Sequence, residues 1–373
     1  MKRLLVRGTN WLGDAVMTIP ALMRLREKFP EAYIALVSPE KLRELWLHHP
    51  AVDEVISTRR REGPLAIAKK IRQANFDAAL VLPNSPRSAM EVFLAGIPNR
   101  IGYAQPWRNF FLTQILERRA SGVKMRKRTA SEIKKLARTS PQTGTRNAPF
   151  LASAHQARVY LDLASALGAN PEPLAAKLVV TPEEIEAAKK TFRFEDMAYK
   201  HPFFGINPGA EYGGAKRWPA EKFIATALGV RERVACNWLI FGGPGDKEIA
   251  EKIERGIGSA IYNLAGQTSL REMMALMKMC RVFLTNDTGP MHVAAALAVP
   301  VVAIFGSTSP ELTAPLAANA SRVHILASDA ACSPCFLREC PIDFRCMKGI
   351  SVDCVVETIA EAASGERRIE RVI

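Results

Sequence analysis

The 373-residue chain lacks any apolar run of the roughly 18 residues that a membrane-spanning helix needs. Its first residues, MKRLLVRGTNWLGD, also lack the apolar core of a secretory signal peptide. These two absences predict a cytoplasmic protein. Aromatic residues make up only 7% of the chain, and no recognised nucleic-acid-binding module is present. Because single-stranded nucleic acids are held largely by aromatic stacking, we expect no nucleic-acid partner.

Two common nucleotide-binding motifs are missing as well. The first strand, turn and helix carry no G-x-G-x-x-G, and no acid ends the second predicted strand, which excludes the NAD fingerprint. The glycine-rich loop near residue 210 is not a Walker A loop. A short-period repeat is also absent, so a solenoid is excluded.

Acidic residues are scarce in the first part of the chain. Residues 1–170 carry 28 Lys and Arg against 13 Asp and Glu, a net charge of +15. Residues 171–373 carry 23 against 24, a net charge of −1. The first part should therefore attract anionic partners, such as phosphorylated small molecules or a membrane face. Its basic clusters are either solvated faces or a surface that holds an acidic acceptor: Arg59-Arg60-Arg61, Arg118-Arg119 and Lys124–Arg128.

Strands and helices alternate in two successive series. Apolar strand patterns alternate with helical patterns first up to about residue 120 and again from residue 203. A basic, poorly patterned segment, 121–147, and a linker, 168–173, lie between them. The chain is long enough for two cores. We therefore predict an α/β protein of two Rossmann-like, doubly wound domains, 1–170 and 171–373, that face each other across a cleft.

The first chemical motif is Gly8-Thr-Asn-Trp-Leu-Gly13-Asp14, at a strand-to-helix turn. Its two glycines permit a tight turn and the close approach of a ligand to backbone N–H groups. Asp14 has two readings. It is either an acidic residue that the positive end of the helix dipole stabilises, or a general base.

The second motif is Asn207-Pro-Gly209-Ala-Glu-Tyr-Gly-Gly-Ala-Lys216-Arg217-Trp-Pro219, which follows the first strand of the second series. Its glycines and Lys216 form a plausible cradle for a diphosphate, and an ordinary solvated loop is the alternative. Asp246 follows Gly242-Gly-Pro-Gly245. It either lines the nucleotide side of the cleft or caps a helix.

The third motif is Thr285-Asn-Asp287-Thr288-Gly289-Pro-Met-His292. It predicts a helix whose free N–H groups point at an anionic ligand. His292 is either a satisfied core histidine or a ligand contact in the first helical turn.

Seven cysteines form an odd set, and four of them lie close together: Cys332, Cys335, Cys340 and Cys346. A reducing compartment disfavours structural disulfides. The C-x2-C-x4-C-x5-C spacing is compatible with a tetrahedral zinc site, although it is shorter than that of common zinc modules. Buried or free thiols are the alternative, so the metal content stays unknown.

Together these motifs resemble the lipopolysaccharide heptosyltransferases, most closely the members that add the second heptose of the inner core. R-G-T-N-W-L-G-D at 7–14, N-P-G-A-x-Y-G-x-A-K-R-W-P at 207–219 and N-D-T-G-x-M-H-V-A-A-A-L at 286–297 stand in the family's order along nearly the whole chain. The resemblance implies a GT-B fold and a peripheral enzyme at the inner face of the cytoplasmic membrane. It also implies inverting transfer without a metal or other cofactor.

The resemblance further implies a donor, an acceptor and roles for residues. The second domain would bind ADP-heptose, and the first would bind an acceptor built on phosphorylated lipid A. Asp14 would be the catalytic base, and Lys216 would neutralise the leaving diphosphate. The implied donor-binding residues are Gly209, Lys216, Asp246, Asp287, Thr288, Gly289 and His292. The implied acceptor-binding residues are Asn10, Gly13, Arg59, Arg60 and Arg61.

Other functions remain open at this point. A GT-B enzyme that uses another nucleotide sugar, or that transfers the first heptose to Kdo2-lipid A, fits the same motifs. A nucleic-acid-binding protein driven by charge fits less well. The sequence does not define the oligomeric state.

Overall fold

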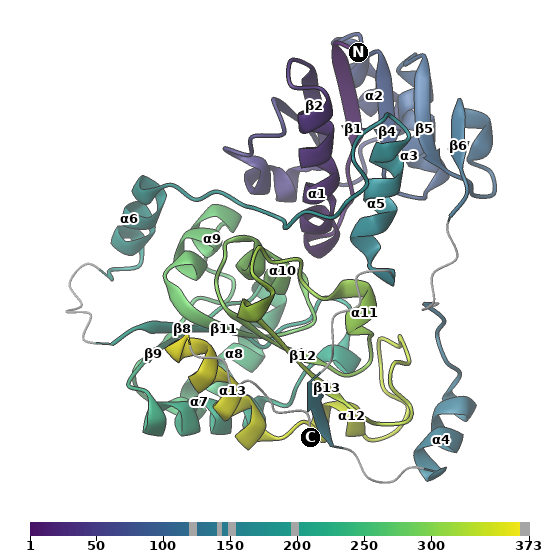
Figure 1. The fold of residues 1–373 in the computed structure, drawn as a ribbon. Coiled ribbons are helices and arrows are strands. Elements are labelled where there is room, and N and C mark those ends of the chain that lie inside the picture. Colours follow the sequence, from purple (N-terminus) through teal and green to yellow (C-terminus); the bar gives the residue numbers. More distant parts are fainter. Residues whose placement is uncertain (119–124, 140–143, 148–153, 195–200, 366–373) are drawn as a thin grey trace. The chain divides into compact units, whose positions relative to one another are not determined.

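The computed structural model describes residues 1–118, 125–139, 144–147, 154–194 and 201–365. They divide into two compact units (Figure 1). Unit 1 comprises Met1–Gly122 and Ser153–Val179, and unit 2 comprises Val123–Ala152 and Val180–Ile373. The boundary expected between residues 170 and 171 therefore lies inside the second piece of unit 1. In addition, the described residues between 125 and 147 belong to unit 2 and not to the N-terminal domain.

Unit 1 is built on a six-stranded parallel sheet in the order β3-β2-β1-β4-β5-β6. Its strands are β1 (Arg3–Arg7), β2 (Tyr33–Pro39), β3 (Glu54–Thr58), β4 (Ala78–Val81), β5 (Asn99–Tyr103) and β6 (Gln114–Leu116). Its helices are α1 (Leu12–Lys28), α2 (Pro64–Arg72), α3 (Pro86–Leu94) and α5 (Gln156–Ser165). The central strands are continuous apolar runs because helices cover both faces of a parallel sheet.

Unit 2 is built on a seven-stranded sheet in the order β10-β9-β8-β11-β12-β13-β7. Only β7 is antiparallel to its neighbour. The strands are β7 (Thr145–Asn147), β8 (Phe203–Asn207), β9 (Asn237–Ile240), β10 (Ile261–Asn263), β11 (Cys280–Asn286), β12 (Val301–Phe305) and β13 (Val323–Ser328). The helices are α4 (Ala130–Thr139), α6 (Pro182–Thr191), α7 (Ala220–Arg233), α8 (Lys247–Ile257), α9 (Leu270–Lys278), α10 (Gly289–Ala296), α11 (Pro310–Thr313), α12 (Arg345–Lys348) and α13 (Val352–Ser364).

Both sheets follow the same winding rule. Counted from its first parallel strand, each sheet has the order 3-2-1-4-5-6, the doubly wound Rossmann order. The winding reverses between β1 and β4 in unit 1 and between β8 and β11 in unit 2. Ligands of such sheets bind outside the carboxyl ends of the strands at this reversal. The fold therefore singles out one edge of each unit as a candidate site.

The segment expected to be poorly patterned contributes α4 and β7 to unit 2. Ile133 of α4 is buried in the core of unit 2. The Arg345 guanidinium donates to the Ala137 carbonyl over 2.7 Å, and the Arg128 N–H donates to the Cys335 carbonyl over 3.1 Å. Two short elements without long apolar runs leave little pattern in the sequence, since long-range packing holds them in place.

This assignment changes the distribution of charge. By sequence count, unit 1 carries 21 Lys and Arg against 13 Asp and Glu, a net charge of +8. Unit 2 carries 30 against 24, a net charge of +6. The expectation that the basic character belongs to one domain is therefore wrong for the units as they fold.

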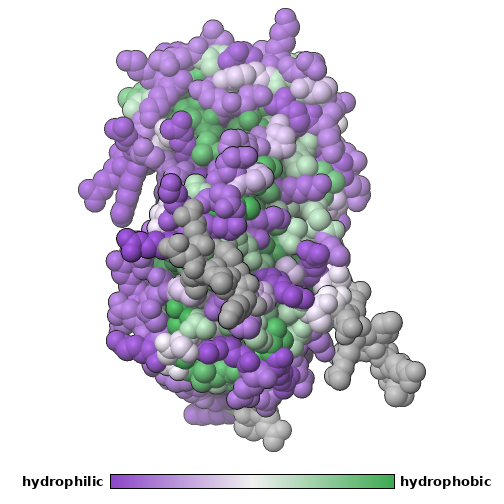
Figure 2. Space-filling view, turned by 90° about the vertical axis from the view of Figure 1, so that its left-hand side faces the viewer, coloured by the Kyte–Doolittle hydropathy of each residue, from purple (hydrophilic) through white to green (hydrophobic). Residues whose placement is uncertain are grey.

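The surface in Figure 2 is dominated by hydrophilic residues, and hydrophobic residues gather on it only in small groups. In the part of the chain that the structure describes, no helix is both long enough and apolar enough to cross a membrane.

Candidate active site

At the reversal point of unit 2, two asparagines tie the second and third motifs together. Asn286 ends β11, and its side-chain amide donates to the Pro208 carbonyl over 2.8 Å. Its side-chain oxygen accepts the Trp218 N–H over 3.1 Å. Asn207 ends β8 and donates over 3.4 Å to the Thr285 hydroxyl. The two loops that follow these strands are therefore held as one structure.

Lys216 and Asp287 are brought together by this arrangement. The Lys216 Nζ lies 2.6 Å from Asp287 Oδ2, and both side chains are largely buried. The Thr308 hydroxyl donates to the same carboxylate oxygen over 2.6 Å, and the Thr313 hydroxyl lies 3.4 Å from Asp287 Oδ1. The ammonium also stands 5.0 Å from the centre of the Tyr212 ring. The predicted cation is thus fixed in place by a carboxylate and an aromatic face.

The glycines of the second motif are required by close packing. A Cβ at Gly209 would lie 2.3 Å from Asp246 Oδ2. Gly213 has a φ of +151°, and a Cβ there would meet the Arg338 carbonyl oxygen at 2.5 Å. Both positions exclude a side chain, so the loop keeps its backbone free for the close approach of other groups.

Asp246 serves the loop more than the helix that it precedes. It occupies the N-cap position of α8 but makes no capping hydrogen bond there. Its carboxylate instead accepts the Gly243 N–H over 3.0 Å and the Arg217 guanidinium over 3.2 Å. Of the two sequence-based readings, the structure favours placement beside the glycine loop.

The third motif forms the N-terminus of α10 as predicted. Thr288 is the N-cap, Pro290 lies in the first turn, and the Thr288 side chain makes no capping hydrogen bond. Pro290 has no N–H, and the Met291 N–H donates to the Thr288 carbonyl over 3.1 Å, so this turn offers an anion mainly the positive end of the helix dipole. His292 lies one turn into the helix and is buried, with 4% of its surface exposed.

Sequence reasoning missed the third strand end at this edge. Gly306, Ser307 and Thr308 directly follow β12, and Thr308 contacts Asp287 as described above. The Ser307 hydroxyl is buried and has no hydrogen-bond partner among the described residues. The signal was present, since Gly-Ser-Thr after a buried strand repeats the pattern of a small, polar strand end.

At the reversal point of unit 1, the first motif is fastened to the sheet. The Gly8 N–H donates to the Val37 carbonyl over 2.9 Å, and a Cβ at Gly8 would lie 3.0 Å from that oxygen. The buried Arg7 guanidinium donates to the Gly8 carbonyl over 2.7 Å and to Glu91 over 2.7 Å. Glu91 is fully buried on α3. Sequence reasoning did not identify this ion pair, because its partners are 84 positions apart.

Asp14 lies in the first turn of α1, partly exposed. Burial raises the pKa of the Tyr160 phenol on α5, and the nearby Asp14 carboxylate raises it further. The phenol therefore stays protonated at neutral pH beside the candidate base. Gly13 is partly exposed and Asn10 is exposed, so the loop surface is accessible.

Arg59, Arg60 and Arg61 are exposed in the loop after β3. The Arg59 N–H donates to Glu62 over 2.8 Å, and its guanidinium stands 3.8 Å from Glu40. These arginines lie at the carboxyl-end edge of the sheet, as the other site residues do. However, β2 and β1 both lie between their strand, β3, and the reversal point.

The cysteine cluster packs as part of a hydrophobic core. Cys332, Cys335 and Cys346 are buried in the core of unit 2, and Cys340 is partly exposed. Burial is the largest cause that raises the pKa of Cys346, to about 12. Within the described ranges, no group of three or more His, Cys, Asp or Glu side chains is arranged to hold a metal ion.

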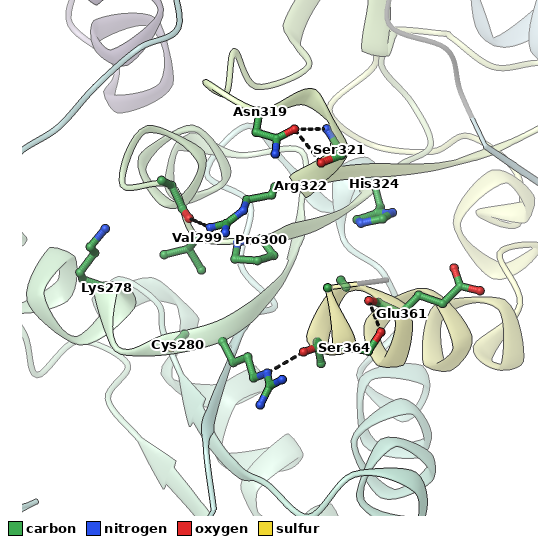
Figure 3. A pocket seen from close by; sticks show the side chains of 15 residues that line it. Lys278, Cys280, Val299, Pro300, Asn319, Ser321, Arg322, His324, Glu361 and Ser364 are labelled. Carbon is green, nitrogen blue, oxygen red and sulfur yellow. Dashed lines mark hydrogen bonds between the residues drawn. The ribbon is translucent and has the colours of Figure 1, made fainter. Parts of the chain in front are cut away.

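A pocket of about 550 Å³ lies at the opposite end of the unit 2 strands (Figure 3). Three basic side chains that line the pocket donate hydrogen bonds to carbonyl groups at helix C-termini. Lys278 donates to the Leu297 carbonyl, Arg322 to the Ala298 carbonyl and Arg281 to the Ala363 carbonyl. Cations at helix C-termini stabilise the helix dipole, so the basic character of this pocket is structural.

Solved structures of similar proteins define the class. The structure of E. coli ADP-heptose lps heptosyltransferase II matches with a TM-score of 0.75 and 26% identity, over 98% of this chain and 99% of that one. E. coli heptosyltransferase WaaC with ADP matches in fold, with a TM-score of 0.65 and 18% identity over 97% of this chain and 100% of that one. The fold is therefore α/β with two parallel sheets of the GT-B type.

Sequence comparisons narrow the class to a family. The model of glycosyltransferase family 9 (heptosyltransferase) matches residues 145–344. Lipopolysaccharide heptosyltransferase 2 of Escherichia coli (strain K12) is 30% identical over 337 residues, 87% of this chain and 88% of the relative. The chain belongs to glycosyltransferase family 9, and it is a heptosyltransferase.

Proposed function

We propose that this heptosyltransferase moves L-glycero-D-manno-heptose from ADP-heptose to heptosyl-Kdo2-lipid A, in the assembly of the lipopolysaccharide inner core. The observation that carries the proposal is the placement of Lys216 and the N-terminus of α10 at one reversal point. A diphosphate requires such a pair of a point charge and backbone donors. Two relatives that are 30% identical over 87% of the chain are named lipopolysaccharide heptosyltransferase 2, which supports this acceptor.

We assign the donor to unit 2. Gly209, Asp287, Thr288, Gly289 and His292 surround the ADP-heptose, with Asp246 holding the glycine loop that faces it. Lys216 stabilises the charge that develops on the diphosphate as the sugar leaves. A preorganised cation at a developing charge contributes more than one that must be reoriented from water.

We assign the acceptor to unit 1. Asn10, Gly13 and the arginines at 59–61 hold the phosphorylated lipid, and Asp14 accepts the proton of the attacking hydroxyl. Proton transfer to this carboxylate accompanies the departure of the sugar. A single in-line displacement inverts the configuration at the sugar carbon.

The reaction needs no metal in this scheme, because Lys216 and the helix N-terminus supply the positive charge. Treatment with a chelator should leave the rate of transfer unchanged. We place the protein in the cytoplasm, in peripheral contact with the inner face of the membrane where its lipid acceptor lies.

The test is incubation with ADP-heptose and heptosyl-Kdo2-lipid A, followed by mass spectrometry of the acceptor. A gain of one heptose unit is expected. Parallel reactions with Kdo2-lipid A test the first-heptose acceptor, and UDP-sugars and GDP-sugars test other donors. Transfer only from another nucleotide sugar would overturn the assigned donor.

A further inference from the structure

The connection between β5 and β6 exposes two large aromatic side chains. Trp107 is 90% exposed and Phe110 is 80% exposed. Exposed hydrophobic residues are common singly, but two of this size three positions apart in one short loop are not. At such exposures these side chains stand away from the surface and do not form part of a flat packed patch.

The loop that carries them is firmly anchored. Arg108, between the two aromatic residues, is fully buried, and its guanidinium donates to the Val81 carbonyl over 3.1 Å and to Asn84 over 3.4 Å. A second arginine, Arg100, donates to the Phe111 carbonyl over 2.7 Å. The exposure of the aromatic side chains is therefore a fixed feature of the fold.

Trp107 also carries a strained backbone. Its φ is +62°, in the left-handed region that bulky residues rarely adopt. Such strain persists where the surrounding structure enforces it, and it concentrates at functional positions. Here Arg108 enforces it from below, and the result is an indole held in solvent.

Phe110 is supported from behind by other rings. Its centroid lies 5.9 Å from that of Phe93 and 5.5 Å from that of Phe111. Phe93 itself is 37% exposed at the end of α3. The contacts with Phe93 and Phe111 hold the Phe110 ring in place with its apolar surface facing solvent.

Basic residues outnumber acidic ones in the segment around these aromatic residues. Residues 92–116 contain no Asp or Glu and two arginines, Arg100 and Arg108. The exposed Arg118 follows β6, with its guanidinium 5.5 Å from the Tyr103 ring. With the exposed Glu117 counted, residues 92–118 carry three arginines and one acid, and this net positive charge complements an anionic surface.

We propose that Trp107 and Phe110 dock unit 1 on an anionic lipid bilayer. The indole and the phenyl ring enter the headgroup region, where amphipathic and aromatic side chains are favoured, while the exposed Arg118 meets lipid phosphate. Isolated protruding rings fit a deformable lipid surface better than a flat protein partner. The inference rests on the proposed function, since a lipid-linked acceptor requires the enzyme to work at a bilayer.

The test measures binding of the full chain to vesicles of phosphatidylethanolamine and phosphatidylglycerol by co-sedimentation. Trp107→Ala and Phe110→Ala should each weaken binding about tenfold, because each removes most of the burial free energy of one ring. Vesicles of phosphatidylcholine alone should bind the wild type more weakly. Leu65→Ala, at a side chain of α2 that is 71% exposed, is the matched control and should bind as the wild type does.

Activity separates this inference from the proposed function. With an acceptor whose acyl chains have been removed, the double variant should transfer heptose as the wild type does. With the acceptor embedded in vesicles, it should be slower. Wild-type protein that binds vesicles through these rings but transfers no heptose would leave the docking surface standing and overturn the proposed function.

Three results would overturn the docking surface. The first is unchanged vesicle binding by the double variant, and the second is an equal loss in Leu65→Ala. The third is a wild-type dimer that the double variant converts to a monomer in sedimentation velocity, which would identify the rings as a contact between two copies of the chain.

Discussion

The ammonium of Lys216 lies 2.6 Å from the carboxylate of Asp287, at the point where the sheet of unit 2 reverses its winding. Two residues assigned to the same donor are therefore already partners before a donor arrives. Asp287 holds the cation in position, and Thr308 holds Asp287. If the donor binds as proposed, its diphosphate meets a lysine that is already oriented and needs little reorganisation.

Lys216→Met should lower kcat about a hundredfold or more, because the leaving diphosphate loses its cation. The variant should remain folded but less stable, since it leaves the Asp287 carboxylate buried without its partner. Steady-state kinetics and circular dichroism measure the two effects. Lys252→Met is the control, since Lys252 pairs with Glu221 at the surface of the same unit. Wild-type kcat in Lys216→Met would refute the assigned role.

Asp14→Asn should lower kcat by about a hundredfold to ten-thousandfold, the usual contribution of a general base, and leave KM for the donor nearly unchanged. The amide keeps the shape of the side chain, so the helix should persist with a loss of about 1 kcal/mol or less at its N-terminus. Glu27→Gln, at the exposed far end of α1, is the control. If both variants have wild-type kcat, Asp14 is not the base.

Sequence patterns could place candidate donor residues at one edge where those residues lie close to a strand end. Asn207, Lys216, Asp287 and the α10 N-terminus follow strands whose apolar runs are unmistakable, so their shared edge could be inferred from parallel winding. Gly-Ser-Thr at 306–308 marked a third polar strand end, but the contact of Thr308 with Asp287 could not be inferred from that pattern.

The described residues between 125 and 147 were predicted in the wrong domain for a related reason. β7 is a three-residue antiparallel edge strand, and nothing local in residues 145–147 shows that it pairs with β13. α4 has an amphipathic pattern, but the pattern does not say which core receives Ile133. Chain position alone favoured the first domain, whereas long-range packing places both elements in unit 2.

Replacing Arg59, Arg60 and Arg61 together by alanine should weaken binding of the acceptor and leave the Kd for ADP-heptose nearly unchanged. This selectivity must come from the position of the three arginines and not from the net charge of their unit, because both units carry net positive charge. These arginines lie at the carboxyl-end edge of the unit 1 sheet, far along the chain from the donor motifs. Calorimetric titrations with each ligand measure the two affinities.

The matched control for this triple variant removes exposed basic residues of unit 2. Lys134→Ala with Lys135→Ala, on α4, should change neither affinity. An equal loss of donor and acceptor binding in the arginine variant would refute the division of labour between the units.

Arg7→Met should lower the free energy of unfolding by about 3–5 kcal/mol, because it removes the buried cation that pairs with the fully buried Glu91 side chain. Arg87→Ala is the internal control. Arg87 contacts the other oxygen of the same carboxylate, but its side chain is half exposed. Its loss should cost about 1 kcal/mol or less. Urea unfolding measures both values, and equal losses would show that burial does not decide the strength of these pairs.

His49 should make the protein less stable in mild acid. Burial lowers its pKa from 6.5 to about 4, and its Nε2 has no hydrogen-bond partner among the described residues. Between pH 6.5 and pH 4 the unfolded chain therefore binds a proton that the folded protein excludes. Its contribution to stability is fully present above pH 6.5 and is lost as the pH falls towards 4.

The slope of the unfolding free energy against pH should approach about 1.4 kcal/mol per pH unit for His49 alone. Urea unfolding across this range, compared with His49→Gln, isolates that slope, and parallel curves for the two proteins would show that His49 does not titrate on unfolding.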